Sequence, residues 1–165
     1  MAITDALLPE FDHETGTTRR LLERLPEDKF GWKPHQKSMS LGRLATHLAE
    51  VPHWGTVTLG ATEFNMPAGS YQPVEKATRG EILALFDEHV AALRRQLESV
   101  SDGELMVMWT FKNDGQAVFS LPRIGVLRTL VMNHMIHHRG QLSVYLRQND
   151  VPLPSIYGPS ADERG

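Results

Sequence analysis

The chain has 165 residues, about one domain at the usual ~100–200 residues each, so we expect a single domain over residues 1–165. Its 41% hydrophobic and 22% charged residues are typical of a globular protein and exclude wholesale disorder. With 17 basic and 20 acidic residues the net charge is −3, which disfavours binding to nucleic acid or to anionic membranes. Zero cysteines exclude disulfides, thiolate zinc sites and a cysteine nucleophile.

The first residues, Met-Ala-Ile-Thr-Asp, carry neither the basic nor the apolar segment of a signal peptide. No run in the sequence approaches the ~18 apolar residues of a membrane span. The sequence therefore predicts a cytoplasmic protein with no membrane partner.

Apolar residues at helical spacing predict a first helix over residues 5–25, ended by Pro26. An ordered connection follows. Ser40 is a suitable N-cap for a second helix over residues 41–62, and Pro52 predicts a kink or break within it.

Residues 65–77 combine prolines and glycine without a period and predict a long loop, a feature often functional in small domains. Thr78 and Glu81 form a capping box that predicts a third helix over about 79–99. Two short apolar runs within residues 106–119 flank a turn sequence and predict a β-hairpin.

A last helix is predicted over about 122–148, and residues 154–165 read as a loosely held tail. Four amphipathic helices and one small hairpin indicate an all-α four-helix bundle. Sites in such bundles usually lie in the core between facing helices, so we look for function inside the bundle.

The sharpest local signal is a group of histidines on the last predicted helix. His134 and His138 are four positions apart, about 40° around the helix axis with a rise of about 6 Å, so both imidazoles can reach one ion. Apolar residues dominate the first half of that face, so it points into the bundle. His137 lies about 100° from His138 and about 60° from His134, so it can share an ion with one of these two histidines more easily than with both.

His47 is the best third ligand because it lies on an inward, apolar stripe of the second helix. Three neutral imidazoles leave a coordination position open for water, as in catalytic rather than structural metal sites. The alternative is that these histidines are polar core or surface residues. Structural or solvated roles are expected for the remaining ones: His13, His35, His53 and His89.

Three segments, 24–35, 40–50 and 133–142, resemble in order the motifs of the DinB-like superfamily. The resemblance implies a four-helix bundle of up-down-down-up topology, a long crossover between the second and third helices, and frequent homodimers. The predicted loop at 65–77 fits that crossover.

In this superfamily a histidine of the second helix and an HxxxH pair of the last helix bind a divalent metal, usually zinc or nickel. By position these ligands are His47, His134 and His138, the same three that the helix geometry selects. His137 occupies a position that is often histidine without being a ligand.

The resemblance also implies a thiol-dependent S-transferase-like activity on a small-molecule substrate. Superfamily members include bacillithiol- or mycothiol-dependent transferases, a mycothiol-dependent maleylpyruvate isomerase and sulfoxide-forming enzymes. A low-molecular-weight cosubstrate thiol at the open metal position would be deprotonated and held for attack on an electrophile. The absence of cysteine from the chain is no obstacle to this chemistry.

Two alternatives remain open: a hydrolase using metal-bound water, and a non-catalytic bundle that binds a metal or a small molecule. Glu50 is the candidate base for hydrolysis because it follows His47 by three positions, although it can equally be a partner of His47 or a solvated charge. Trp54 and Tyr145 each follow a predicted ligand by seven positions and can line a substrate pocket or simply pack.

Overall fold

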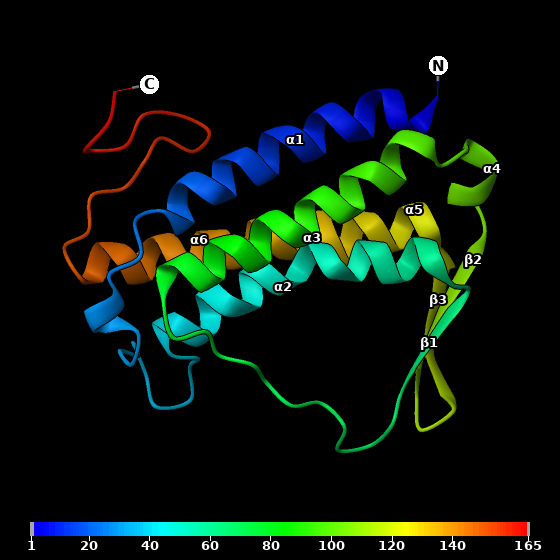
Figure 1. The fold of residues 1–165 in the computed structure, drawn as a ribbon, viewed down its shortest axis with the longest axis horizontal. Coiled ribbons are helices and arrows are strands. Elements are labelled where there is room, and N and C mark those ends of the chain that lie inside the picture. The colour runs from blue at the N-terminus through cyan, green and yellow to red at the C-terminus, as the bar shows by residue number, and fades with distance from the viewer. Residues whose placement is uncertain (1, 165) are drawn as a thin grey trace.

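The computed structural model of the protein describes residues 2–164. Its long helices are α1 (Ile3–Leu22), α2 (Leu41–Gly60), α3 (Arg79–Ser99) and α6 (His134–Gln148). Helices α1 and α2 each pack against both α3 and α6, and the buried faces share one apolar core (Figure 1). The predicted mainly helical fold is therefore confirmed.

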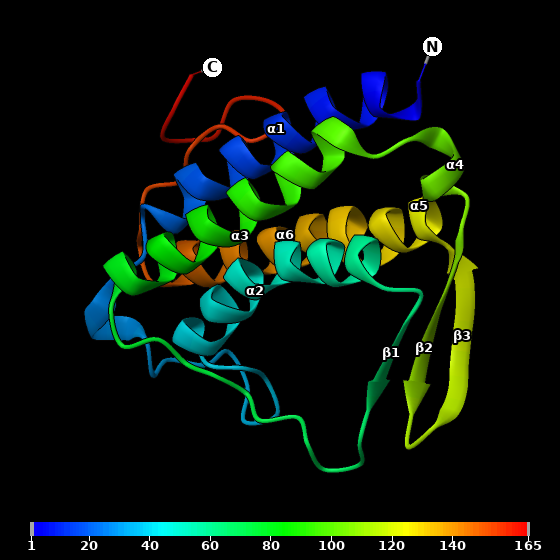
Figure 2. The same ribbon diagram turned by 45° about the vertical axis from the view of Figure 1, so that its right-hand side comes forward.

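The shorter elements lie between these helices and are listed in chain order: the 3₁₀ turn η1 (Glu27–Lys29), β1 (Glu63–Met66), α4 (Asp102–Leu105), β2 (Met108–Asn113), β3 (Gln116–Pro122), α5 (Arg123–Val126) and the π-helical segment η2 (Leu127–Asn133). Strands β1, β2 and β3 form a sheet beyond one end of α2 (Figure 2). The chain then returns from β1 to α3 through the long connection predicted from its prolines and glycine.

The predicted hairpin is confirmed, and it belongs to a larger sheet than expected. Strands β2 and β3 are antiparallel, and the turn residues Asp114 and Gly115 have φ angles of 50° and 76°, which a two-residue type I′ turn requires. The sheet has a third strand, because β1 pairs in parallel with β2. Sequence reasoning missed β1 because a four-residue strand whose partner lies more than forty residues away has no local signature.

The observed helix boundaries correct three details of the prediction. Helix α1 ends at Leu22, before the predicted residue 25, because the chain already turns ahead of Pro26. Of the kink or break expected at Pro52, the break is wrong, since α2 stays helical to Gly60, with its packing against α3 and α6 opposing the ~3 kcal/mol cost of an internal proline, while the kink stays a prediction. The last helix has the predicted extent, but its Leu127–Asn133 portion is π-helical. None of the helices within residues 2–164 is long and apolar enough to cross a bilayer.

The prediction of a loosely held tail is wrong for the described residues. The hydroxyl of Tyr157 donates to the Glu14 carboxylate at 2.9 Å and accepts from the Arg139 guanidinium at 2.6 Å. Arg139, 1% exposed, pairs with Glu14 at 2.7 Å. Two surface ion pairs add to this attachment: Arg24–Glu163 and Arg147–Asp162. Some of these partners are more than a hundred residues apart in the sequence and others only about fifteen, and no pattern relates them. The sequence therefore contains no sign of the attachment.

The buried pair predicts a large effect of one substitution. Glu14→Gln leaves the Arg139 charge buried without its counter-ion, so we expect the free energy of unfolding to fall by about 3–5 kcal/mol. Glu98→Gln is the matched control, because it breaks the solvent-exposed pair with Arg94 and should cost less than about 1 kcal/mol. Urea unfolding followed by circular dichroism measures both; similar costs for the two variants would contradict the expectation.

Candidate metal centre

The structure brings together the three predicted ligand residues. His47 comes from α2, and His134 and His138 come from α6. The Nε2 atom of His134 lies 3.3 Å from Nε2 of His47 and 2.8 Å from Nε2 of His138. One nitrogen from each of the three rings lies within 4.8 Å of the others, which is compatible with binding a single divalent ion.

The position of His47 follows from the way α2 begins and packs. The Ser40 hydroxyl accepts the backbone N–H of Arg43 at 3.0 Å, as an N-cap should, and starts the helix at Leu41. Leu44 and Leu48 are fully buried on the same helix. This packing holds α2 against α6 and leaves the intervening His47 half-buried at their interface.

The second nitrogen of each imidazole faces an acceptor. Nδ1 of His138 lies 2.7 Å from the Gln141 side-chain oxygen, and Nδ1 of His134 lies 3.3 Å from the Leu130 carbonyl oxygen. Nδ1 of His47 lies 3.6 Å from the Glu50 carboxylate. A proton on each Nδ1 satisfies these acceptors and leaves three Nε2 lone pairs directed at one another. That donor set fits a divalent cation, because histidine ligands normally donate their other N–H in this way.

Burial keeps the two α6 imidazoles in the neutral form that binds metals. The pKa of His138 is lowered to about 4, chiefly by burial and then by the neighbouring His47 and His134, against the opposing effect of the hydrogen bond to Gln141. The pKa of His134 is also lowered, mainly by burial and then by His47. Both rings are therefore unprotonated at neutral pH.

Glu50 faces His47 from the side away from the other histidines. Burial alone would raise the pKa of its carboxyl, but the nearby His47 ring and the Arg43 guanidinium outweigh burial, so the pKa lies below its usual value. Its carboxylate pairs with Arg43 at 3.0 Å, and Arg43 also donates to the Tyr71 hydroxyl at 2.6 Å. An ionised carboxylate in this place orients the His47 ring.

The π-helical segment ends immediately before His134, and its Leu130 carbonyl is the acceptor for that imidazole. Such wide turns occur frequently at functional sites. Sequence reasoning missed this turn, since Leu127–Asn133 contains neither glycine nor proline to signal a change of helix type.

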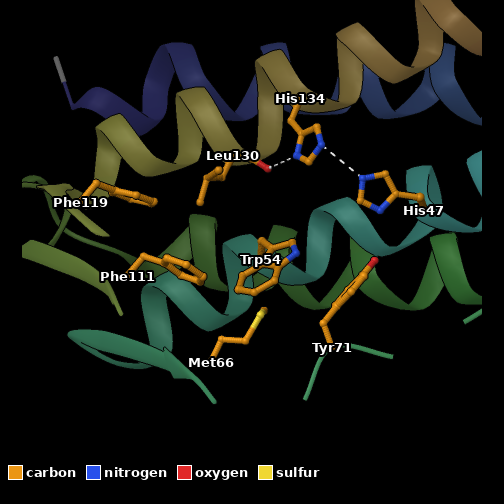
Figure 3. Close-up of a pocket in the computed structure, with 8 residues that line it drawn as sticks. All are labelled: His47, Trp54, Met66, Tyr71, Phe111, Phe119, Leu130 and His134. Carbon is orange, nitrogen blue, oxygen red and sulfur yellow. Dashed lines mark hydrogen bonds between the residues drawn. The ribbon is translucent and has the colours of Figure 1, made fainter. Parts of the chain in front are cut away.

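A cavity of about 270 Å³ opens beside the histidines. His47 and His134 lie at one end of it and Phe119 at the other (Figure 3). The remaining lining residues are Trp54, Met66, Tyr71, Phe111 and Leu130. A second cavity of about 350 Å³ shares His47, Trp54 and Tyr71 with the first and adds polar groups: Glu50, His53, Lys76 and His89.

The pocket predictions for Trp54 and Tyr145 have different outcomes. Trp54 lines both cavities. Tyr145 lines neither: its ring packs edge-on against Trp32 at 5.4 Å, and its hydroxyl contacts the Met39 carbonyl oxygen at 3.4 Å. Seven-residue spacing from His138 puts Tyr145 on the same side of α6, but Tyr145 lies about three turns beyond His134, the residue of α6 that lines the first cavity.

The other histidines of α2, α3 and α6 stay outside the group of three. His137 is exposed, with its ring 5.0 Å from that of His138. The rings of His53 and His89 lie 5.0 Å apart at the second cavity, and Nδ1 of His89 contacts the Ala49 carbonyl oxygen at 3.0 Å. Structural roles were expected for these two histidines, and no local pattern in the sequence shows that they share a cavity with His47.

The protein is thus of the helical class, with a small sheet at one end and a candidate three-histidine metal site between two helices. The chain belongs to the DinB family, which it matches over residues 1–164. Two Bacillus subtilis (strain 168) proteins are similar in sequence. The uncharacterized protein YrdA is 27% identical, covering 96% of this chain and 90% of its own, and the uncharacterized protein YjoA is 27% identical, covering 90% and 92%.

Two solved structures share the fold. A DinB-like protein from Bacillus cereus ATCC 10987 superposes with a TM-score of 0.75 at 22% identity, covering 94% of this chain and 98% of its own. The DinB-like protein YjoA from Bacillus subtilis superposes with a TM-score of 0.69 at 23% identity, covering 90% and 95%.

The hydrogen bond from His138 to Gln141 predicts an effect on metal affinity. Gln141→Ala removes the acceptor that holds Nδ1, so zinc affinity should fall about 10- to 100-fold while the fold is retained. Gln148→Ala, an exposed glutamine two turns further along α6, is the matched control and should leave affinity unchanged. Competition with a chromogenic chelator measures both; equal affinities for the two variants would show that Gln141 does not orient the ligand.

Burial of His138 also predicts a pH dependence of the metal-free protein. Between pH 6.5 and about 4 the unfolded chain protonates His138 and the folded chain does not, so the free energy of unfolding falls as the pH is lowered through this range. His138→Gln should make that slope shallower by up to about 1.4 kcal/mol per pH unit. Urea unfolding with a chelator present measures the slopes, and equal slopes for the two proteins would contradict the prediction.

Proposed function

We propose that this protein is a metal-dependent enzyme with zinc or nickel at His47, His134 and His138, and that it transfers a low-molecular-weight thiol to a small-molecule electrophile. The observation that carries the proposal is the convergence of three Nε2 atoms whose partner Nδ1 atoms each face an acceptor. Three protein ligands leave a coordination position for a cosubstrate, as in catalytic metal sites.

The chain's own residues would orient the metal ligands and leave room for two reactants. Gln141, Leu130 and Glu50 fix the orientation of the three imidazoles. The chain has no cysteine, so the thiol has to come from a cosubstrate. When bound, the metal would supply the Lewis acidity that keeps this thiol deprotonated at neutral pH. The two cavities that share His47 offer separate places for the cosubstrate and the electrophile.

Hydrolysis by metal-activated water is the alternative that the geometry favours less. A general base for that reaction has to reach water bound on the Nε2 side of the histidines. Glu50 faces Nδ1 of His47 instead, and its lowered pKa makes it a weaker base. The positioning role proposed for Glu50 therefore agrees better with transfer to an electrophile than with hydrolysis.

Several expectations from the sequence and from its resemblance accompany this proposal and stay predictions. They are the up-down-down-up topology of a four-helix bundle, a single domain over residues 1–165, assembly as a homodimer and a location in the cytoplasm.

Elemental analysis of protein purified without a histidine tag tests the metal site. We expect about one zinc or nickel per chain in the wild type and less than a tenth of that in His47→Ala, His134→Ala and His138→Ala, because two imidazoles bind weakly. His137→Ala, an exposed histidine on the same helix, is the matched control and should retain the metal. Metal-free wild type after incubation with both ions would overturn the proposal.

Removal of the metal separates an enzyme from a bundle that the metal merely holds together. A preformed catalytic site should keep its helical circular dichroism after chelation and lose thiol-transfer activity, whereas a structural site should lose helicity. The activity assay follows consumption of free thiol with a soluble electrophile such as 1-chloro-2,4-dinitrobenzene. Loss of helicity together with absence of metal-dependent thiol consumption would favour the non-catalytic alternative.

A further inference from the structure

Each of the three strands of the sheet carries one phenylalanine of an aromatic series beside the first cavity. Phe64 on β1 pairs with Phe111 on β2, and Phe111 pairs with Phe119 on β3. Their rings are near-parallel, at 6.2 Å and 18° for the first pair and 5.7 Å and 14° for the second. Cross-strand neighbours in register thus present one continuous series of rings.

Trp54 of α2 completes this aromatic surface. Its ring meets Phe64 edge-on at 5.2 Å and Phe111 at 6.4 Å. Trp54, Phe111 and Phe119 line the cavity that contains His47 and His134 (Figure 3). Phe64 lines an adjoining hollow instead. We call Trp54, Phe111 and Phe119, with Met66 and Leu130, the aromatic cavity.

The sheet does not bury these rings as a structural core would. Phe64, Phe111 and Phe119 remain partly exposed, the last two as lining of the cavity, although Trp109 on the same sheet is fully buried. The aromatic residues therefore have contact surface available for a ligand. A volume of about 270 Å³ lies just below the ~300–1,000 Å³ of ordinary ligand pockets and suits a molecule built around one ring.

We infer that the aromatic cavity binds an uncharged, planar ring of the electrophilic substrate, with the reactive group directed toward the histidines. This inference rests on the proposed function and names its substrate class. Planar rings gain about 0.5–1.5 kcal/mol from aromatic partners beyond the burial of their area, which saturated rings do not. No Asp, Glu, Lys or Arg side chain lines this cavity within the described chain, and a metal at the histidines would repel a cationic ligand.

A matched pair of ligands tests the inference without requiring turnover. Benzamide and cyclohexanecarboxamide share a polar group and differ in whether the ring is aromatic. We expect the metal-loaded protein to bind benzamide about 2- to 12-fold more tightly, measured by NMR titration with the Trp54 indole N–H as reporter. Phe111→Leu and Phe119→Leu should each bring this ratio toward one. Val118→Ala, an exposed neighbour of Phe119 on β3, is the matched control and should keep the wild-type ratio.

The outcomes distinguish this inference from the metal proposal. Equal affinity for the two amides, absence of binding by either, or a ratio unchanged in both phenylalanine variants would overturn the inference even if the metal is present. Tighter binding of tetramethylammonium than of benzamide would overturn it as well. If His134→Ala protein has lost its metal but still prefers benzamide to cyclohexanecarboxamide, the ring site is supported and its dependence on the metal centre is overturned.

Discussion

Three imidazole nitrogens directed at one another across the α2–α6 interface are the constraint around which the rest of the site is arranged. Neutral rings with their protons on Nδ1 place three lone pairs together, which is unfavourable unless a cation lies between them. Separate elements maintain this arrangement: Glu50 from α2, Leu130 from the π-helical segment and Gln141 from α6 each meet one Nδ1. The helices therefore supply both the ligands and the acceptors that determine which nitrogen of each ligand is free.

The helices and the sheet contribute different parts of the site: the helices carry the histidines, and the sheet carries aromatic side chains of the cavity. The helices hold the histidines at an interface fixed by core packing, where small shifts in position are resisted. The sheet, placed beyond one end of α2, contributes Phe111 and Phe119 to the cavity. Substrate preference in such an arrangement can change through substitutions on the strands while the metal-binding residues stay the same.

Sequence reasoning reached the helices and the ligand residues because both depend on periodicity. His134 and His138 are one helical turn apart, and His47 lies within an apolar stripe, so their convergence follows once α2 and α6 are known to face each other. The same reasoning failed for Tyr145, since equal angular position on a helix says nothing about how far along the axis a cavity extends. Strand β1 and the aromatic series depend on pairing between distant segments, which no local pattern records.

The attachment of the C-terminal segment also affects the direction in which the ligand side chains point. Arg139 follows His138 directly in α6, and its guanidinium is buried on Glu14 of α1 and on Tyr157 of the tail. A helix held by a buried ion pair one residue from a ligand resists turning about its own axis. Rotation of α6 by the ~100° that separates successive residues would exchange an imidazole for a guanidinium at the cavity. Through Tyr157 the tail thus helps to hold α6 in one orientation about its axis. A segment remote from the histidines therefore helps to set the direction in which they point.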